Sequence, residues 1–158
     1  MILVPEAQRA ETFKGLFIHG ALFHIQDYRF EDYTGKDKFL LVMRGLATDG
    51  NCYFYLPTSK VDQYRSNPVF RNSLYVFPNK SIVHFPVETA IVIANCRHRP
   101  YQLFEGRYIN QPVGKDLVFL DFIPQEHMEA ICAMVHDSEE ISDFHKRQLI
   151  PPQAQKQD

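Results

Sequence analysis

The sequence predicts a mainly β fold of the α+β class, a sheet or small barrel followed by one or two helices. Thirteen Phe and eight Tyr residues gather in short runs that Gly, Pro, Asn and Asp interrupt, a pattern typical of strands and turns. Near the end of the chain the apolar period changes to that of a helix. With 158 residues, the chain has the length of one domain, which we place at residues 1–150 with a tail at 151–158.

The strands are predicted from apolar and aromatic runs. A strand at 21–25 and a charged loop from Tyr28 to Asp37 precede the apolar run KFLLVMR at 38–44, which is typical of a strand covered on both faces. Residues 48–51 read TDGN, a strong turn signal, so the next strand at 52–56 is its hairpin partner. Further strands are expected at 74–77, 82–85, 89–94 and 117–122.

Three helices are expected. Ser59 can cap a short helix that Asn67 and Pro68 end. The segment 95–115 is expected to be a connection, with an irregular strand near 101–104. A helix from Pro124 to about His136 buries a stripe of Met128, Ile131, Cys132 and Val135, and a last helix, capped by Asp137, buries Ile141, Phe144 and Leu149.

Composition excludes several classes of function. The net charge of −2 gives no general attraction to nucleic acid or membrane, so a phosphate site must be local. Three cysteines without a CxxC pair indicate a reducing compartment, and the absence of a signal or membrane segment predicts a cytoplasmic protein. The histidines lack ligand spacing and the hydrolase and nucleotide-binding motifs are missing, so we expect no metal and no cofactor.

One candidate site is formed by polar residues at two strand ends. If 38–44 and 52–56 pair through the turn, Lys36 and Lys38 meet Thr58 and Ser59 at one rim. Two cations and two hydroxyl donors suit a phosphodiester whose charge grows during in-line attack. The alternative is that Ser59 only caps a helix and that the lysines are solvated loop charges.

A second candidate is the run Arg97, His98, Arg99 and Tyr101. Arginine interleaved with aromatic rings is used to hold single-stranded RNA, the guanidinium binding phosphate and the ring stacking on a base. The alternative is a charged loop whose arginines neutralise Glu105 and Asp116.

Four stretches, GALFHI, DKFLLVM, LPTSK and IPQEHMEAICAMV, resemble the PemK/MazF family of toxin endoribonucleases. The resemblance implies an SH3-like barrel, a homodimer, an antitoxin partner and metal-independent cleavage of single-stranded RNA through a cyclic phosphate. It assigns Lys38, or Lys36, to the place of the family's catalytic arginine, and Thr58 and Ser59 to its hydroxyl pair. Lysine is a point charge rather than a bidentate fork, which departs from the family pattern.

The remaining roles follow from side-chain chemistry. Arg97 and Arg99 are expected to contact the RNA backbone, and His98 is the imidazole able to shuttle a proton near neutral pH. Two other functions stay open: a barrel without activity that binds a protein through aromatic anchors such as Phe70, Tyr75 and Phe77, and an RNA-binding module that does not cleave.

Overall fold

The computed structural model describes residues 4–28, 36–110 and 116–151. Its helices and strands alternate along the chain in the following order: α1 (Glu6–Leu16), β1 (Ala21–Tyr28), β2 (Lys36–Arg44), β3 (Asn51–Tyr55), α2 (Val61–Arg65), η1 (Arg71–Ser73), β4 (Leu74–Val76), β5 (Ala90–Val92), η2 (Ile93–Asn95), β6 (Arg97–Pro100), α3 (Tyr101–Asn110), β7 (Leu117–Phe122), α4 (Gln125–Asp137) and α5 (Asp143–Leu149). The α+β class predicted from the sequence is confirmed.

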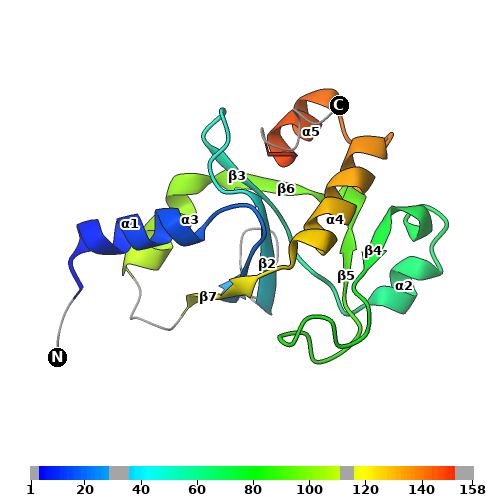
Figure 1. Cartoon of the computed structure of the whole chain (residues 1–158), viewed down its shortest axis with the longest axis horizontal. Helices are drawn as coiled ribbons and strands as arrows, with labels where there is room; N and C mark the ends of the chain where they lie inside the picture. Colours follow the sequence, from blue (N-terminus) through cyan, green and yellow to red (C-terminus); the bar gives the residue numbers. More distant parts are fainter. Residues whose placement is uncertain (1–3, 29–35, 111–115, 152–158) are drawn as a thin grey trace.

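An antiparallel sheet of five strands, in the order β6-β3-β2-β1-β7, forms the centre of the fold, and β4 and β5 form a separate pair. The sheet is open, with β6 and β7 at its edges, so the expected closure into a barrel is not found among the described strands. Helices α1 and α3 lie together at one side of the sheet (Figure 1) and cover one of its faces.

The sheet separates two hydrophobic cores, because successive strand residues point to opposite faces. On one face, Phe23, Val42 and Phe54 pack under α1 and α3. On the other, Leu41, Tyr53 and Tyr55 pack under α4, α5 and the β4–β5 pair. Figure 1 shows α4, β4 and β5 on the side of the sheet away from α1.

Strong local signals were predicted well. The β2–β3 hairpin forms with Gly50 at φ +84 in its turn, where the Asp49 carboxylate accepts a hydrogen bond from the Asn51 N–H at 3.0 Å. Helix α4 buries Met128, Ile131 and Val135 as expected, whereas Cys132 of the same predicted stripe is half-buried.

Five local predictions were wrong. No strand forms at 82–85, and residues 101–110 form helix α3 rather than an irregular strand. Ser59 is not a helix cap, since α2 begins after Lys60 without a side-chain cap bond. Ser142, not Asp137, caps α5 by accepting from the His145 N–H, and Phe144 is 48% exposed instead of buried.

Three predictions lie wholly or partly outside the described residues. They are most of the charged loop between Tyr28 and Asp37, the tail beyond residue 151, and the side chain of Lys36, whose backbone begins β2 opposite Tyr28. Within the described part of the chain, no helix is long and apolar enough to cross a membrane.

Candidate functional site

A polar pocket opens where the chain leaves β3. It encloses about 30 Å³, which is room for about two water molecules. Its wall comes from the end of β3, helix α2, and the segment from β5 to β6, with these lining residues: Tyr55, Leu56, Thr58, Tyr64, Val92, Asn95 and Arg97. The pocket therefore joins one residue of each cluster singled out in the sequence, Thr58 from the hydroxyl pair and Arg97 from the arginine run.

Thr58 reaches the pocket because the chain changes its pairing partner after β3. The β2–β3 register, Leu41 opposite Tyr55, would place Lys38 opposite Thr58 if the ladder continued. The ladder ends at Tyr55, and Pro57 has no N–H with which to extend it. Thr58 then pairs with Ala90, with two N–H···O bonds of 2.9 Å.

Lys38 belongs to a different strand pair. It lies opposite Ile25 of β1 and does not line the pocket. The rim expected between Lys38 and Thr58 stays a prediction, whereas the described pocket brings Thr58 to Arg97.

The Thr58 hydroxyl is oriented by a local turn. Its oxygen accepts a hydrogen bond from the Lys60 N–H at 3.1 Å. Because that bond uses a lone pair, the hydroxyl proton can still be donated to a ligand oxygen. The neighbouring Ser59 is exposed and does not line the pocket, so the hydroxyl pair of the sequence contributes one member.

The run Arg97-His98-Arg99 divides between the two faces of β6. Arg97 lies opposite Phe54 and Arg99 opposite Cys52, and both partners belong to the core under α1 and α3. His98 lies opposite Tyr53 and stacks on its ring on the other face, with centroids 5.3 Å apart and planes at 28°. Since paired residues point to the same face, His98 projects away from the face of Arg97.

Tyr101 does not join this group. Its side chain is 9% exposed and packs 5.5 Å from the Phe13 ring, within the core under α1 and α3. Burial raises its pKa to about 12, so the phenol is neutral and its ring face is occupied by the core.

Several lining residues were not singled out in the sequence, among them Asn95 and Tyr64. Asn95 ends η2, and Tyr64 lies on α2 with its ring edge-on to Phe70 at 5.4 Å. Neither belongs to a motif, and both reach the pocket through tertiary contacts with the segment after β5. Asn95, Tyr64, Thr58 and Arg97 all have side chains that can form hydrogen bonds, so the pocket lining is largely polar in composition.

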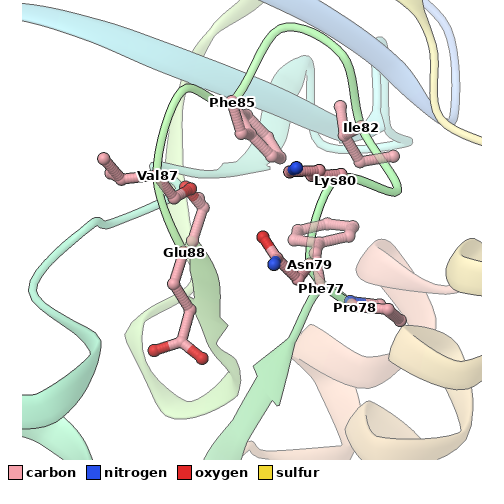
Figure 2. Close-up of a pocket in the computed structure, with 9 residues that line it drawn as sticks. Phe77, Pro78, Asn79, Lys80, Ile82, Phe85, Val87 and Glu88 are labelled. Atoms are coloured by element: carbon pink, nitrogen blue, oxygen red, sulfur yellow. The ribbon is translucent and has the colours of Figure 1, made fainter.

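The loop between β4 and β5 carries a second, smaller pocket of about 10 Å³. Figure 2 shows Lys80 beside the Phe85 ring, while the Glu88 carboxylate points away from it. Lys80 has a φ of 61, and Phe85 packs on Phe39 of β2 at 5.1 Å. This loop replaces the strand predicted at 82–85, and it fixes Ala90, the pairing partner of Thr58, at its far end.

A thiol and an imidazole meet elsewhere in the fold. The Cys132 Sγ lies 4.0 Å from His19 Nε2, and His19 Nδ1 lies 2.7 Å from the Met43 carbonyl oxygen. Burial raises the pKa of Cys132 to about 11 and lowers that of His19. Both groups are therefore held neutral, which is unsuitable for a thiolate nucleophile.

No group of three or more His, Cys, Asp or Glu side chains in the described ranges is arranged to hold a metal ion. No family model and no curated protein sequence matches the chain. The assignment of a function therefore depends on the chemistry of the pocket residues.

Proposed function

We propose that the protein is a PemK/MazF-like endoribonuclease that binds single-stranded RNA and cuts it, without a metal ion, at a phosphodiester held by Thr58, Asn95 and Arg97. The observation that carries the proposal is the meeting of Thr58 and Arg97 in one polar pocket. An SH3-like origin of the open sheet is part of the proposal and rests on the four stretches that resemble the family.

The pocket residues match the charges of such a reaction. The RNA 2′-hydroxyl attacks the adjacent phosphorus, forming the O2′–P bond and breaking the P–O5′ bond. The products are a 2′,3′-cyclic phosphate and a 5′-hydroxyl, so the proton lost from O2′ balances the proton gained by O5′. Arg97 offers a bidentate fork to the phosphate oxygens, and the Thr58 hydroxyl donates to the oxygen that gains charge.

Arg97 also removes a difficulty left by the sequence. Lys36 and Lys38 were expected to replace the family's arginine, although an ammonium does not match two phosphate oxygens geometrically. A guanidinium that lines the same pocket as the threonine supplies that geometry from another strand.

A second function is favoured by a specific feature of the pocket. Its lining contains neither an imidazole nor a carboxylate, and His98 projects to the opposite face of β6. General acid–base catalysis contributes about 10²–10⁴-fold to such reactions. A pocket without these groups also suits a protein that binds RNA and leaves it intact.

The test is cleavage of a single-stranded RNA by the purified protein in the presence of EDTA. We expect Thr58→Val to lower the rate by about a hundredfold, the cost of losing one donor to a developing oxyanion, and Arg97→Lys to lower it at unchanged charge. Thr12→Val makes the same chemical change at an exposed position of α1 and serves as the control.

The outcomes separate the alternatives. Binding without cleavage selects the RNA-binding function. Cleavage that Thr58→Val and Arg97→Lys leave unchanged refutes the pocket as the site, and an equal loss in Ser59→Ala supports the hydroxyl pair predicted from the sequence instead.

The proposal extends to the partners that the resemblance implies, a second copy of the chain and an antitoxin, in a cytoplasmic toxin–antitoxin system. Growth arrest of a bacterial host on expression, relieved by Thr58→Val, would support this. Normal growth with a catalytically active protein would contradict it.

A further inference from the structure

The face of β6 to which His98 points carries a connected group of aromatic rings. The His98 ring lies 5.6 Å from the His145 ring, which lies 5.5 Å from the Phe144 ring. The Tyr53 ring packs against both imidazoles, with its centroid 5.3 Å from that of His98 and 6.0 Å from that of His145, and Tyr53 is 1% exposed. We call the His98, His145 and Phe144 rings the aromatic patch.

The aromatic patch is accessible and firmly held. His98 is exposed, His145 is half-buried and Phe144 is 48% exposed. Tyr53 is anchored through its hydroxyl, which donates to the Asp49 carboxylate at 2.5 Å. Figure 1 shows α5, which carries Phe144 and His145, beside the β3–β6 end of the sheet.

Helix α5 is fixed in this place by polar contacts as well. The Gln148 amide N–H donates to the Thr48 hydroxyl at 3.1 Å, and an Arg44 N–H donates to the Arg147 carbonyl oxygen at 3.2 Å. The Ser142 hydroxyl accepts the N–H of His145 and begins the helix. These bonds hold the backbone of α5 in place beside the sheet.

Basic side chains lie beside the aromatic patch. Arg44 bonds the backbone of α5, and Lys146 and Arg147 lie in the last turn of that helix. Among the acidic residues, Asp49 is bonded to Tyr53 and Asn51, Asp143 is the first residue of α5, and Asp137, Glu139 and Glu140 precede that helix. Arg44, Lys146 and Arg147 therefore place positive charge beside the rings carried by α5.

We propose that the aromatic patch is a binding site for unpaired nucleobases of single-stranded RNA, which stack on the His98, His145 and Phe144 rings while the surrounding cations attract the backbone. Exposed rings flanked by arginine and lysine are the combination that holds single strands without base pairing. This inference rests on the proposed function for the identity of the strand, and it names a second subsite outside the pocket.

The geometry connects the two subsites. Arg97 and His98 are neighbours on a strand at the edge of the sheet, and their side chains point to opposite faces. A strand that crosses this edge can place a phosphate in the pocket and nearby bases on the aromatic patch.

The test measures binding of a short fluorescent 2′-O-methyl RNA, which has no free 2′-hydroxyl and cannot be cleaved by the proposed route. We expect Phe144→Leu, which keeps an apolar side chain but removes the ring, to weaken binding about fivefold or more, as for the loss of one stacked base. The control is Phe122→Leu at the opposite edge of the sheet, where Phe122 is 43% exposed.

Two further measurements separate stacking from charge. An abasic oligomer of equal length should bind the native protein and Phe144→Leu equally well. The sequence has no tryptophan, so Phe144→Trp introduces a single fluorophore whose emission a stacked base should quench.

Equal effects of the two leucine variants, or unchanged binding of the abasic oligomer to the native protein, would overturn the aromatic patch as a base-binding site. Ring-dependent binding of the uncleavable strand in a protein that cuts no RNA would refute the cleavage proposal alone. Cleavage with no ring dependence of binding would refute this inference alone.

Discussion

Gly45 tests how the segment after α1 is packed against the end of β2. A Cβ atom added at Gly45 would lie 1.8 Å from the Phe17 carbonyl oxygen and 2.9 Å from its carbonyl carbon. Real Cβ contacts rarely fall below 3.4 Å, so Gly45→Ala requires the two backbone segments to separate by roughly 1.5 Å.

The surroundings make that separation costly. Phe17 is 2% exposed and stacks on Phe13 at 4.5 Å, and the Gly20 N–H donates to the Val42 carbonyl oxygen at 2.8 Å. Moving either backbone segment would disturb the Phe13–Phe17 stacking and the Gly20–Val42 hydrogen bond at the same time. Because the obstacle is backbone rather than a flexible side chain, we expect a loss of about 3 kcal/mol, the upper part of the range for overpacking.

Gly15→Ala provides the matched comparison. Gly15 lies in α1, and nothing approaches its Cβ position within 4 Å, so the change should stabilise the protein by about 0.5–1 kcal/mol through helix propensity. The assay is urea unfolding followed by circular dichroism. A Gly45→Ala free energy of unfolding within about 0.5 kcal/mol of the native value would refute the packing described for this segment.

Three other predictions concern ionisable contacts. The Arg107 guanidinium bonds both carboxylate oxygens of Asp116, at 2.8 and 2.5 Å, and Asp116 has a φ of 71. Asp116→Asn should lower the free energy of unfolding by about 1–3 kcal/mol, and Asp116→Ala by about 1 kcal/mol more because alanine tolerates a positive φ less well. Equal urea midpoints for the two variants would contradict this prediction. Burial lowers the pKa of His19 from 6.5, so the unfolded chain binds more protons than the native protein, and the free energy of unfolding should fall as the pH falls below about 6.5, by up to about 1.4 kcal/mol per pH unit. His19→Asn should remove this pH dependence. An unchanged slope of unfolding free energy against pH in this variant would contradict the prediction. Burial raises the pKa of Asp49, but hydrogen bonds from Tyr53 and Asn51 lower it by more, so the net pKa lies below 3.8. Tyr53→Phe should therefore lower the free energy of unfolding at neutral pH, and its difference from the native protein should shrink below pH 3.8. A difference that stays constant with pH would refute this explanation.

The elements that the sequence predicted well have strong local signals. The β2–β3 hairpin follows from an apolar run, a turn with Gly50 and an aromatic partner strand, and α4 follows from a clear apolar period. These signals lie within a few residues of one another, so they can be recognised without knowledge of the fold.

The helices missed by the sequence depend on distant partners. Helix α1 has a mostly polar sequence and buries Phe13, which packs against Tyr101 and Tyr108 of α3 at 5.5 and 5.1 Å. The aromatic residues and Gly106 of α3 favour a strand or loop locally. An Arg9 N–H bond to the Tyr108 carbonyl oxygen at 2.6 Å joins the two helices across 99 positions, which no local pattern reveals.

The candidate site was predicted in parts but not as a unit. Thr58 and Arg97 were chosen for their chemistry, yet they were assigned to different clusters, because the contact between them depends on the exchange of partner from β2 to Ala90. Asn95 and Tyr64 carried no signal. Pro57, two residues after the end of β3 at Tyr55, is a local indication that the ladder would end there.

The alternation of side chains along β6 determines how the two proposed subsites can cooperate. In a loop, Arg97, His98 and Arg99 could share one ligand, which was the expectation from sequence. In a paired strand they cannot, because Phe54 and Tyr53 fix the faces to which Arg97 and His98 point. Because β6 is an edge strand, no further described strand pairs with its outer side. A ligand can therefore reach both faces of β6 around this edge. A ligand that needs both residues must therefore be long and flexible enough to cross the edge, a condition that a single-stranded nucleic acid meets and a small anion does not.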